Sequence, residues 1–386
     1  MSAVSSRRRH IALAGLVAGG LVLAGCAKSA STGASPTSGS TATSSASSTG
    51  AAQQVETPTA TPPAAGGGAS ATAGPAAAAA GCTNTTYGAP KLDLKTTTVG
   101  FSQSEAESNP FRATETASIT AEAKRLGIKL ITRNANADVS RQNSDIQAMI
   151  AQGAKVLIVA PENSDGLAPS LAAAKAQKIP VLTIDRTVQG KACSDFIGFI
   201  GSNFLGQAVI AADDMGTALG GKGKVAILQG TPGNNVAADR TSGFVNQIKA
   251  KYPGISIVAS QTGNFDQATG QKVTAQILQS NPDLAGVYAE NDGMALGALQ
   301  AIRAAGKRGG KDIKVVGIDG IRQAVQNVAD GTMVSTIETN PRFGPLAFST
   351  LAAFYTPAGA PTKVIIKDGH FTAANAKQAL TNGSVY

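Results

Sequence analysis

The sequence predicts an α/β fold of two doubly wound lobes, each built on a parallel sheet. Short apolar runs alternate with longer segments of helical periodicity from residue 96 onward. These runs fall into two comparable blocks, and polar or charged residues follow most of them. Because strands that alternate with helices form βαβ units with right-handed crossovers, each block is expected to make one lobe.

The first block lies between residues 97 and 200. Its apolar runs are rich in Val, Ile and Leu, as in strands that are buried on both faces. We expect strands at 97–101, 128–132, 156–160, 181–184 and 196–200, and helices at 111–126, 140–152 and 165–177.

The second block repeats this alternation up to residue 337. We expect strands at 224–228, 255–260, 285–289, 314–318 and 333–337, and helices at 203–219, 236–251, 267–280, 292–305 and 321–330. Two blocks of similar length predict two similar lobes.

The first 25 residues have the parts of an export signal. Basic residues 7–9 precede an apolar run at 11–24 that is shorter than the roughly 20 residues a membrane span needs. Residues 23–26 spell Leu-Ala-Gly-Cys and resemble a bacterial lipobox, whose cysteine is lipidated. We therefore expect a lipid on Cys26 that anchors the chain to the outer face of the cell membrane. An ordinary signal peptide with an incidental cysteine is the alternative.

Residues 26–91 are expected to form a disordered tether. They are mostly Ala, Ser, Thr, Gly and Pro, with too few large apolar residues to bury a core. The tether includes Cys82, which can form a disulfide with Cys193 in an exported protein. Two free thiols are the other possibility, and the sequence leaves both open.

The charge pattern argues against a nucleic-acid partner. The formal net charge is +9, but the three arginines at residues 7–9 leave with the signal. The remaining basic residues do not cluster among aromatic residues, as they would on a nucleic-acid surface.

Polar residues gather after the predicted strands. The carboxyl ends of parallel strands meet at one edge of a sheet, which is where open α/β folds bind ligands. The residues that follow the strands include Gln103, Glu105, Glu107, Asp185, Arg186, Asn235, Arg240, Asn291, Asp319 and Glu338. We expect a ligand cleft between the two lobes at these ends.

Paired carboxylates and guanidiniums suit a neutral polyhydroxylated ligand. Each ligand hydroxyl can donate to a carboxylate and accept from an arginine. The C–H face of a sugar also favours an aromatic contact; without tryptophan, Phe111 and Phe265 are the candidates, with core packing as the alternative.

Catalytic and metal sites find little support. The two histidines are His10, which leaves with the signal, and His370, so neither a histidine-based triad nor a zinc site of the His-Glu-x-x-His kind is possible. Residues 216–222 nearly match a phosphate-binding loop, but Gly223 stands where Ser or Thr is required. We expect no enzyme activity, no cofactor and no metal.

Residues 97–372 resemble the periplasmic sugar-binding proteins of ABC importers, of the ribose and galactofuranose type. The resemblance rests on residues 109–111, 182–186, 228–230, 239–240 with 243–244, 264–266, 290–299 and 316–320. It covers the whole predicted body, and its motifs are specific only in combination.

The resemblance implies roles for particular residues. Asp185 and Arg186 would bind sugar hydroxyls from the first lobe, and Arg240, Asn291 and Asp319 from the second. Phe111 and Phe265 would stack on the ring. At Gln103, Glu107, Arg112 and Glu338 the chain resembles the galactofuranose-binding members; at Arg112, for example, ribose binders have a second Phe. We also include Asn235 in the expected ligand set.

The family also implies a hinge of three crossings between the lobes. We place them near residues 201–203, 338–340 and 357–361, which gives a first lobe of residues 92–201 and 340–357 and a second of 202–339 and 358–386. A monomer would then deliver a galactofuranose- or galactose-like sugar to an ABC permease and its ATPase. The alternative is a sensory lipoprotein that presents a bound sugar or polyol to a membrane receptor.

Overall fold

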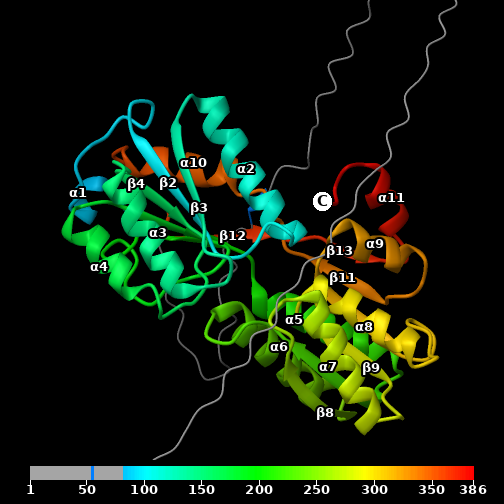
Figure 1. Cartoon of the computed structure of the whole chain (residues 1–386). Helices are drawn as coiled ribbons and strands as arrows, with labels where there is room; N and C mark the ends of the chain where they lie inside the picture. The colour runs from blue at the N-terminus through cyan, green and yellow to red at the C-terminus, as the bar shows by residue number, and fades with distance from the viewer. Residues whose placement is uncertain (1–53, 56–80) are drawn as a thin grey trace, which may run out of the picture. The chain divides into compact units, whose positions relative to one another are not determined.

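The computed structural model describes residues 54–55 and 81–386. In this part of the chain the backbone forms two sheets, each with helices packed against it (Figure 1). The predicted α/β class with two parallel-sheet lobes is confirmed. The predicted signal at 1–25, the lipidation site at Cys26 and most of the tether lie outside the described residues.

The first sheet has the order β1-β12-β6-β5-β4-β2-β3. Its strands are β1 (Gln54–Val55), β2 (Thr98–Gln103), β3 (Lys129–Asn134), β4 (Val156–Val159), β5 (Val181–Ile184), β6 (Phe199–Gly201) and β12 (Lys363–Lys367). All neighbours are parallel except β1, which pairs antiparallel with β12.

Helices cover both faces of this sheet because its central strands are apolar on both sides. In β4, Val156 and Ile158 belong to the core beneath α2 (Pro110–Leu126) and α10 (Gly344–Phe354). Their neighbours Leu157 and Val159 face the opposite core, beneath α3 (Val139–Ala151) and α4 (Ala168–Ala176). Side chains alternate between the faces of a strand, so one short run supplies both cores.

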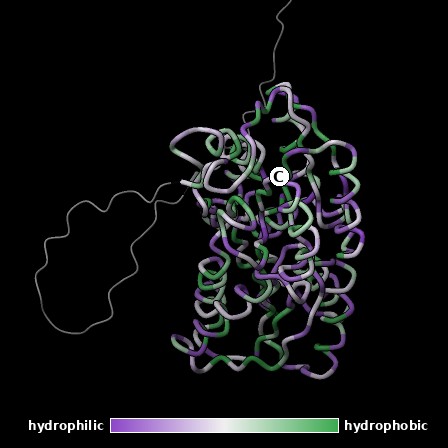
Figure 2. Tube along the Cα trace, turned by 90° about the vertical axis from the view of Figure 1, so that its left-hand side faces the viewer, coloured by the Kyte–Doolittle hydropathy of each residue, from purple (hydrophilic) through white to green (hydrophobic). Residues whose placement is uncertain are grey.

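The second sheet has the order β13-β11-β10-β9-β7-β8. Its strands are β7 (Lys222–Gln229), β8 (Gly254–Thr262), β9 (Gly286–Ala289), β10 (Lys314–Asp319), β11 (Ser335–Glu338) and the antiparallel β13 (His370–Thr372). One core lies beneath α5 (Phe204–Ala218) and α6 (Asn235–Lys251). The other lies beneath α7 (Gln267–Ser280), α8 (Asp292–Ala304), α9 (Arg322–Ala329) and α11 (Ala376–Thr381). Hydrophilic and hydrophobic residues are interspersed along the trace of the folded part (Figure 2).

Every strand and helix expected from the sequence is present, with ends that differ by no more than three residues. The expected tether, however, is wrong at its end. Residues 84–87 form the short helix α1 (Asn84–Tyr87), which Thr83 caps, and Cys82 and Ala89 are buried in the first lobe. The fold therefore includes residues 81–91, because a cysteine and an apolar contact fix them to the body.

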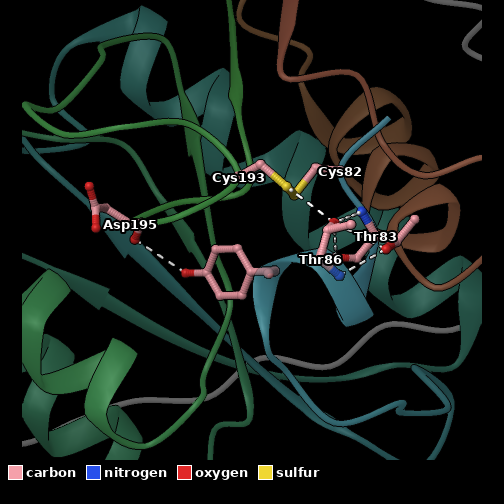
Figure 3. The surroundings of a disulfide bond; sticks show 6 residues. Cys82, Thr83, Thr86, Cys193 and Asp195 are labelled. Atoms are coloured by element: carbon pink, nitrogen blue, oxygen red, sulfur yellow. Dashed lines mark hydrogen bonds between the residues drawn. A yellow bond between two sulfur atoms is a disulfide. The ribbon is translucent and has the colours of Figure 1, made fainter. Parts of the chain in front are cut away.

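A disulfide joins Cys82 to Cys193 and settles the alternative that the sequence left open (Figure 3). Beside it, the Tyr87 hydroxyl donates to the Asp195 backbone oxygen at 3.2 Å. The bond connects the segment before β2 to the loop between β5 and β6, so it reinforces the first lobe.

The third crossing between the lobes also differs from its expected position. Within residues 81–386 the chain crosses at 201–203, at 338–340 and at 368–369, not at 357–361. The reason is β12, which pairs with β6 and so belongs to the first sheet, whereas β13 pairs with β11. Residues 358–367 therefore extend the first lobe.

Candidate ligand pocket between the lobes

The first lobe presents its polar residues through two tight turns. Asn109 caps α2 by accepting from the Phe111 N–H at 3.0 Å, which places Phe111 and Arg112 in the first helical turn. After β5, Asp185 adopts a left-handed conformation with φ 62°, and the Arg186 N–H donates to the Ile184 oxygen at 2.7 Å. The chain therefore bends sharply where the predicted Asp-Arg pair leaves the sheet.

Arg112 and Arg186 are held in a buried network of carboxylates. Arg112 forms ion pairs with Glu105 at 3.3 Å, Glu115 at 2.9 Å and Asp185 at 2.7 Å. Arg186 pairs with Glu105 and, at 3.2 Å, with Glu162. Glu105 is thus shared by both guanidiniums, which fixes them relative to each other.

The network shifts the carboxyl groups in opposite directions. Burial raises the pKa of Glu105, but Arg186 and Arg112 outweigh it and bring that pKa down to about 2. Burial raises the pKa of Glu115 and of Glu162 to about 7, because each has only one arginine as a close partner. Glu105 is therefore ionised at neutral pH, whereas Glu115 and Glu162 titrate near neutral pH.

The second lobe contributes Arg240, Asp319 and Asn291. Arg240 on α6 donates to Asp319 at 3.3 Å and to the Thr339 hydroxyl at 2.7 Å. Burial raises the pKa of Asp319 to about 6, although Arg240 opposes the shift. Asn291 caps α8 and donates to the Phe265 backbone oxygen at 3.1 Å.

Two phenyl rings lie beside the arginines. The Arg112 guanidinium is 4.9 Å from the centre of the Phe111 ring, and that of Arg186 is 5.4 Å from the Phe265 ring. Phe265 has φ 56° and lies against Gly230, where a Cβ atom would come within 1.9 Å of the ring. Gly230 therefore gives the ring the space it needs.

The lobes also contact each other directly. The Thr187 N–H of the first lobe donates to Asn235 Oδ1 at 3.0 Å. Ser164 accepts from the Asn235 N–H at 3.2 Å through its hydroxyl and donates its own N–H to the Gly233 oxygen at 3.0 Å. These bonds hold the lobes closed over the pocket.

The resulting pocket has only about 20 Å³ of free space in this closed arrangement, roughly the room that one water molecule needs. It is lined by Glu105, Asn109, Phe111, Arg112, Asp185, Arg186, Val236, Arg240, Phe265, Asn291, Asp319 and Thr339. Among the described residues, Arg186 Nε has no hydrogen-bond partner, and it lies 3.8 Å from Asp185 Oδ2. A buried donor of this kind needs an acceptor, such as a ligand hydroxyl.

Eight predicted ligand residues line the pocket: Phe111, Arg112, Asp185, Arg186, Arg240, Phe265, Asn291 and Asp319. Four do not. Gln103 is buried behind it and donates to Glu115, Glu107 is exposed, and Asn235 bonds the lobes together. Glu338 accepts from the Gly369 N–H at the third crossing.

Sequence reasoning missed four residues that line the pocket: Glu105, Asn109, Val236 and Thr339. Glu105 stood among the polar residues after β2, but Glu107 was chosen in its place. Thr339 directly follows Glu338, and neighbours in extended chain point to opposite sides. The alternation of side chains along β11 was the signal that could have distinguished Thr339 from Glu338.

Comparisons with known proteins agree with this architecture. Residues 99–354 match the periplasmic binding protein domain. This chain belongs to the periplasmic binding protein family. Its members are substrate-binding proteins without enzymatic activity, and the family is extracytoplasmic.

The chain is similar to proteins of several bacteria. It is 36% identical to the ribose import binding protein of Bacillus subtilis over 65% of this chain and 79% of that protein. It is 33% identical to the galactofuranose-binding protein of Escherichia coli over 70% of this chain and 85% of that protein.

Among solved structures, the arabinose ABC transporter binding protein of Shewanella sp. ANA-3, bound to arabinofuranose, superposes with a TM-score of 0.70. It is 36% identical and covers 74% of this chain and 95% of its own.

Metal ligation and membrane spanning find no support in the described residues. No group of three or more His, Cys, Asp or Glu side chains at 54–55 or 81–386 could hold a metal ion. In the same residues, no helix has the length and apolar character needed to span a membrane.

Proposed function

We propose that this protein captures a monosaccharide between its lobes and delivers it to an ABC permease. The observation that carries the proposal is the pocket itself. It is lined by three arginines and three carboxylates from both lobes together with two phenyl rings, and one buried guanidinium N–H lacks a partner among the described residues. A sugar offers hydroxyls to the arginines and carboxylates, and C–H faces to the phenyl rings.

The charges are paired, which favours a neutral ligand over an ion. Arg112 and Arg186 are each neutralised by carboxylates, and Arg240 is neutralised by Asp319. An anionic ligand would have to displace one of these buried carboxylates, which is costly. Hydroxyl groups can bond to the network without displacing it.

The residues of the pocket favour a galactofuranose- or galactose-like sugar over ribose. Arg112 occupies the place where ribose binders carry a second Phe, so one stacking contact is replaced by a charged donor. That donor is buried and fixed by three carboxylates. The similar protein from Escherichia coli is named for galactofuranose, and the one from Shewanella was solved with arabinofuranose bound, which supports a furanose ligand.

Capture works by closure. A sugar that contacts Asp185 and Arg186 on one lobe and Arg240 and Asn291 on the other stabilises the closed form over the open one. The bonds that Asn235 makes across the cleft add to this preference. The closed protein then docks on the permease, which takes up the sugar.

The lipobox-like residues 23–26 support anchoring through Cys26 to the outer face of the cell membrane, with the tether giving the body reach toward the permease. Acylation at more than one position would make the anchor stable.

A thermal-shift screen of the chain against pentoses, hexoses and their furanose forms tests the proposal. A ligand that binds only the folded state raises the melting temperature. We expect one clear shift that Asp185→Asn abolishes. The control Asp283→Asn, in an exposed pair with Lys224, should keep it. No shift with any sugar would reject the proposal.

The import role has its own test. Cells that lack this protein, or that carry Cys26→Ser, should lose most uptake of the labelled sugar. Unchanged uptake in both strains would remove the permease from the proposal and leave only sugar binding.

A further inference from the structure

The three crossings between the lobes meet at one group of hydrogen-bonded side chains. We call it the hinge node; it consists of Ser202, Gln207, Glu338, Thr339 and Asp368. Ser202 lies on the first crossing, Glu338 and Thr339 on the second, and Asp368 on the third. Gln207, in the first turns of α5, lies between them and is 2% exposed.

Asp368 connects the first and third crossings. One carboxylate oxygen accepts from the Ser202 hydroxyl at 2.9 Å. The other accepts from Gln207 Nε2 at 2.8 Å. The same amide nitrogen lies 3.0 Å from the Glu338 backbone oxygen and 3.0 Å from the Thr339 hydroxyl, both on the second crossing. One amide nitrogen therefore contacts two crossings, and Asp368 joins it to the first.

The other end of the Gln207 amide faces the pocket. Its oxygen accepts from Arg240 Nε at 3.2 Å and from Nη2 at 3.1 Å. Arg240 lines the pocket and also donates to Asp319 and Thr339. A single side chain thus links the backbone that must move during opening to an arginine that is expected to bind the ligand.

The two ends of the Gln207 amide differ, because its nitrogen only donates and its oxygen only accepts. The link to Arg240 therefore depends on which way the amide is turned. Its nitrogen must face the acceptors of the crossings for its oxygen to face Arg240. Rotation of the lobes changes the crossing segments, so the distances within the node change as well. A partner lost in this buried place leaves a polar group unsatisfied, which favours the arrangement in which all bonds form.

We propose that Gln207 is a positioning residue that couples lobe closure to the orientation of Arg240. Closure brings Asp368 and the second crossing to the amide nitrogen and thereby directs the oxygen to the guanidinium. This inference rests on the proposed function, since it concerns how the same pocket is assembled.

Gln207→Glu tests the coupling with little change in shape. The introduced carboxylate still accepts from Arg240 but faces Asp368, which is a second carboxylate. Asp368→Asn in the same chain removes the contact between the two carboxylates, because the asparagine amide can donate to the introduced carboxylate while its oxygen accepts from Ser202. The Glu338 backbone oxygen still lacks its donor, so the repair is partial. Gln247→Glu is the matched control: Gln247 donates to Asp213 at 2.8 Å on the same lobe, away from the crossings.

Two quantities are measured for each variant in the full chain with Cys26→Ser. The first is the affinity for the sugar identified by the screen. The second is the distance between spin labels on cysteines placed at Ala172 on α4 and Gln276 on α7, which are exposed and lie on different lobes. The distance in the ligand-free chain reports the open and closed populations directly.

We expect Gln207→Glu to weaken binding by about tenfold and to shift the ligand-free chain toward the longer distance. The double variant should bind about threefold more tightly than Gln207→Glu alone and should recover part of the shift in distance, and Gln247→Glu should change neither quantity. Weaker binding with an unchanged distance distribution, or no rescue in the double variant, would overturn the coupling. If the parent binds no sugar, the proposed function fails, and the distances still decide whether Gln207 controls the hinge.

Discussion

Glu105 holds both arginines of the first lobe in place. It pairs with Arg112 and with Arg186, while Asp185 adds a second contact to Arg112. The charges must be placed before the sugar arrives, since a fixed network binds hydroxyls without reorganising. In the proposed function, Glu105 therefore contacts the ligand directly and also orients its two arginine partners.

Glu105→Gln should destabilise the protein by about 3 kcal/mol and weaken sugar binding by about tenfold or more, because it removes the charge that two buried guanidiniums share. Denaturant unfolding and titration calorimetry measure the two effects. Glu107→Gln is the matched control, because Glu107 is exposed, and it should change stability by less than about 0.5 kcal/mol. Equal effects of the two substitutions would contradict the placement of Glu105.

Tyr386 supports the pocket from behind. Its hydroxyl hydrogen is shared between the backbone oxygens of Asp319, at 2.9 Å from the hydroxyl oxygen, and Thr339, at 3.1 Å. Its ring packs edge-on against Phe111, with the ring centres 6.3 Å apart. It thus contacts pocket residues of both lobes.

Tyr386→Phe should cost about 1–2 kcal/mol of stability and reduce affinity several-fold, since two carbonyl oxygens lose a donor. Tyr355→Phe is the control: its buried hydroxyl has no hydrogen-bond partner among the described residues, so its removal should be neutral or stabilising. Calorimetric melting and sugar titration of both variants decide the matter; a larger loss from Tyr355→Phe would refute it.

At the level of elements, the sequence predicted the strands and helices between residues 97 and 338 well. Runs such as Val156–Val159 are apolar throughout, and this pattern is characteristic of buried parallel strands. The elements α10, β12, β13 and α11 were not predicted. Residues 341–345 contain two prolines and a glycine, which resembles a loop, and β12 has only three apolar residues between two lysines.

The sheet to which β12 belongs could not be inferred locally. Its pairing with β6 joins residues far apart in the chain, and no nearby motif specifies that partner. The same limit explains the misplaced third crossing. In the pocket, the residues after β5 and β10 were predictable because they end buried strands, whereas Thr339 depended on the exact register of β11.

The disulfide between Cys82 and Cys193 stabilises the first lobe as a unit, and it spans 111 residues of sequence. Replacing both cysteines by alanine should lower the free energy of unfolding by about 2–5 kcal/mol, since a long loop regains its freedom in the unfolded chain. Neither cysteine lines the pocket, so sugar affinity should stay within about twofold. Urea unfolding and titration calorimetry test both statements; a large loss of affinity with unchanged stability would contradict them.

At the scale of the whole molecule, the fold buries several carboxyl groups whose charge it does not fully compensate. Burial raises the pKa of Glu115, Glu162, Glu290 and Asp368 to about 7 and that of Asp319 to about 6. A carboxyl whose folded pKa is raised contributes stability below its unfolded pKa near 4, and this contribution is lost as pH rises through the folded value. Glu105 has the opposite sign, and its contribution is lost as pH falls toward 2.

The melting temperature should therefore fall between pH 5 and pH 8, and sugar binding should be accompanied by proton uptake if opening returns some of these carboxyl groups to water. Melting curves across this range and calorimetry in two buffers of different ionisation enthalpy measure the effects. Asp319→Asn should flatten the pH dependence. A melting temperature that rises steadily from pH 5 to pH 8 would show that the raised carboxyls do not dominate.

Small-angle X-ray scattering of the chain with and without the sugar from the screen tests capture between the lobes most directly. If the sugar draws the lobes together, the radius of gyration falls as it is added and saturates with the same concentration dependence as binding. Binding that leaves the scattering of an open form unchanged would contradict capture by closure.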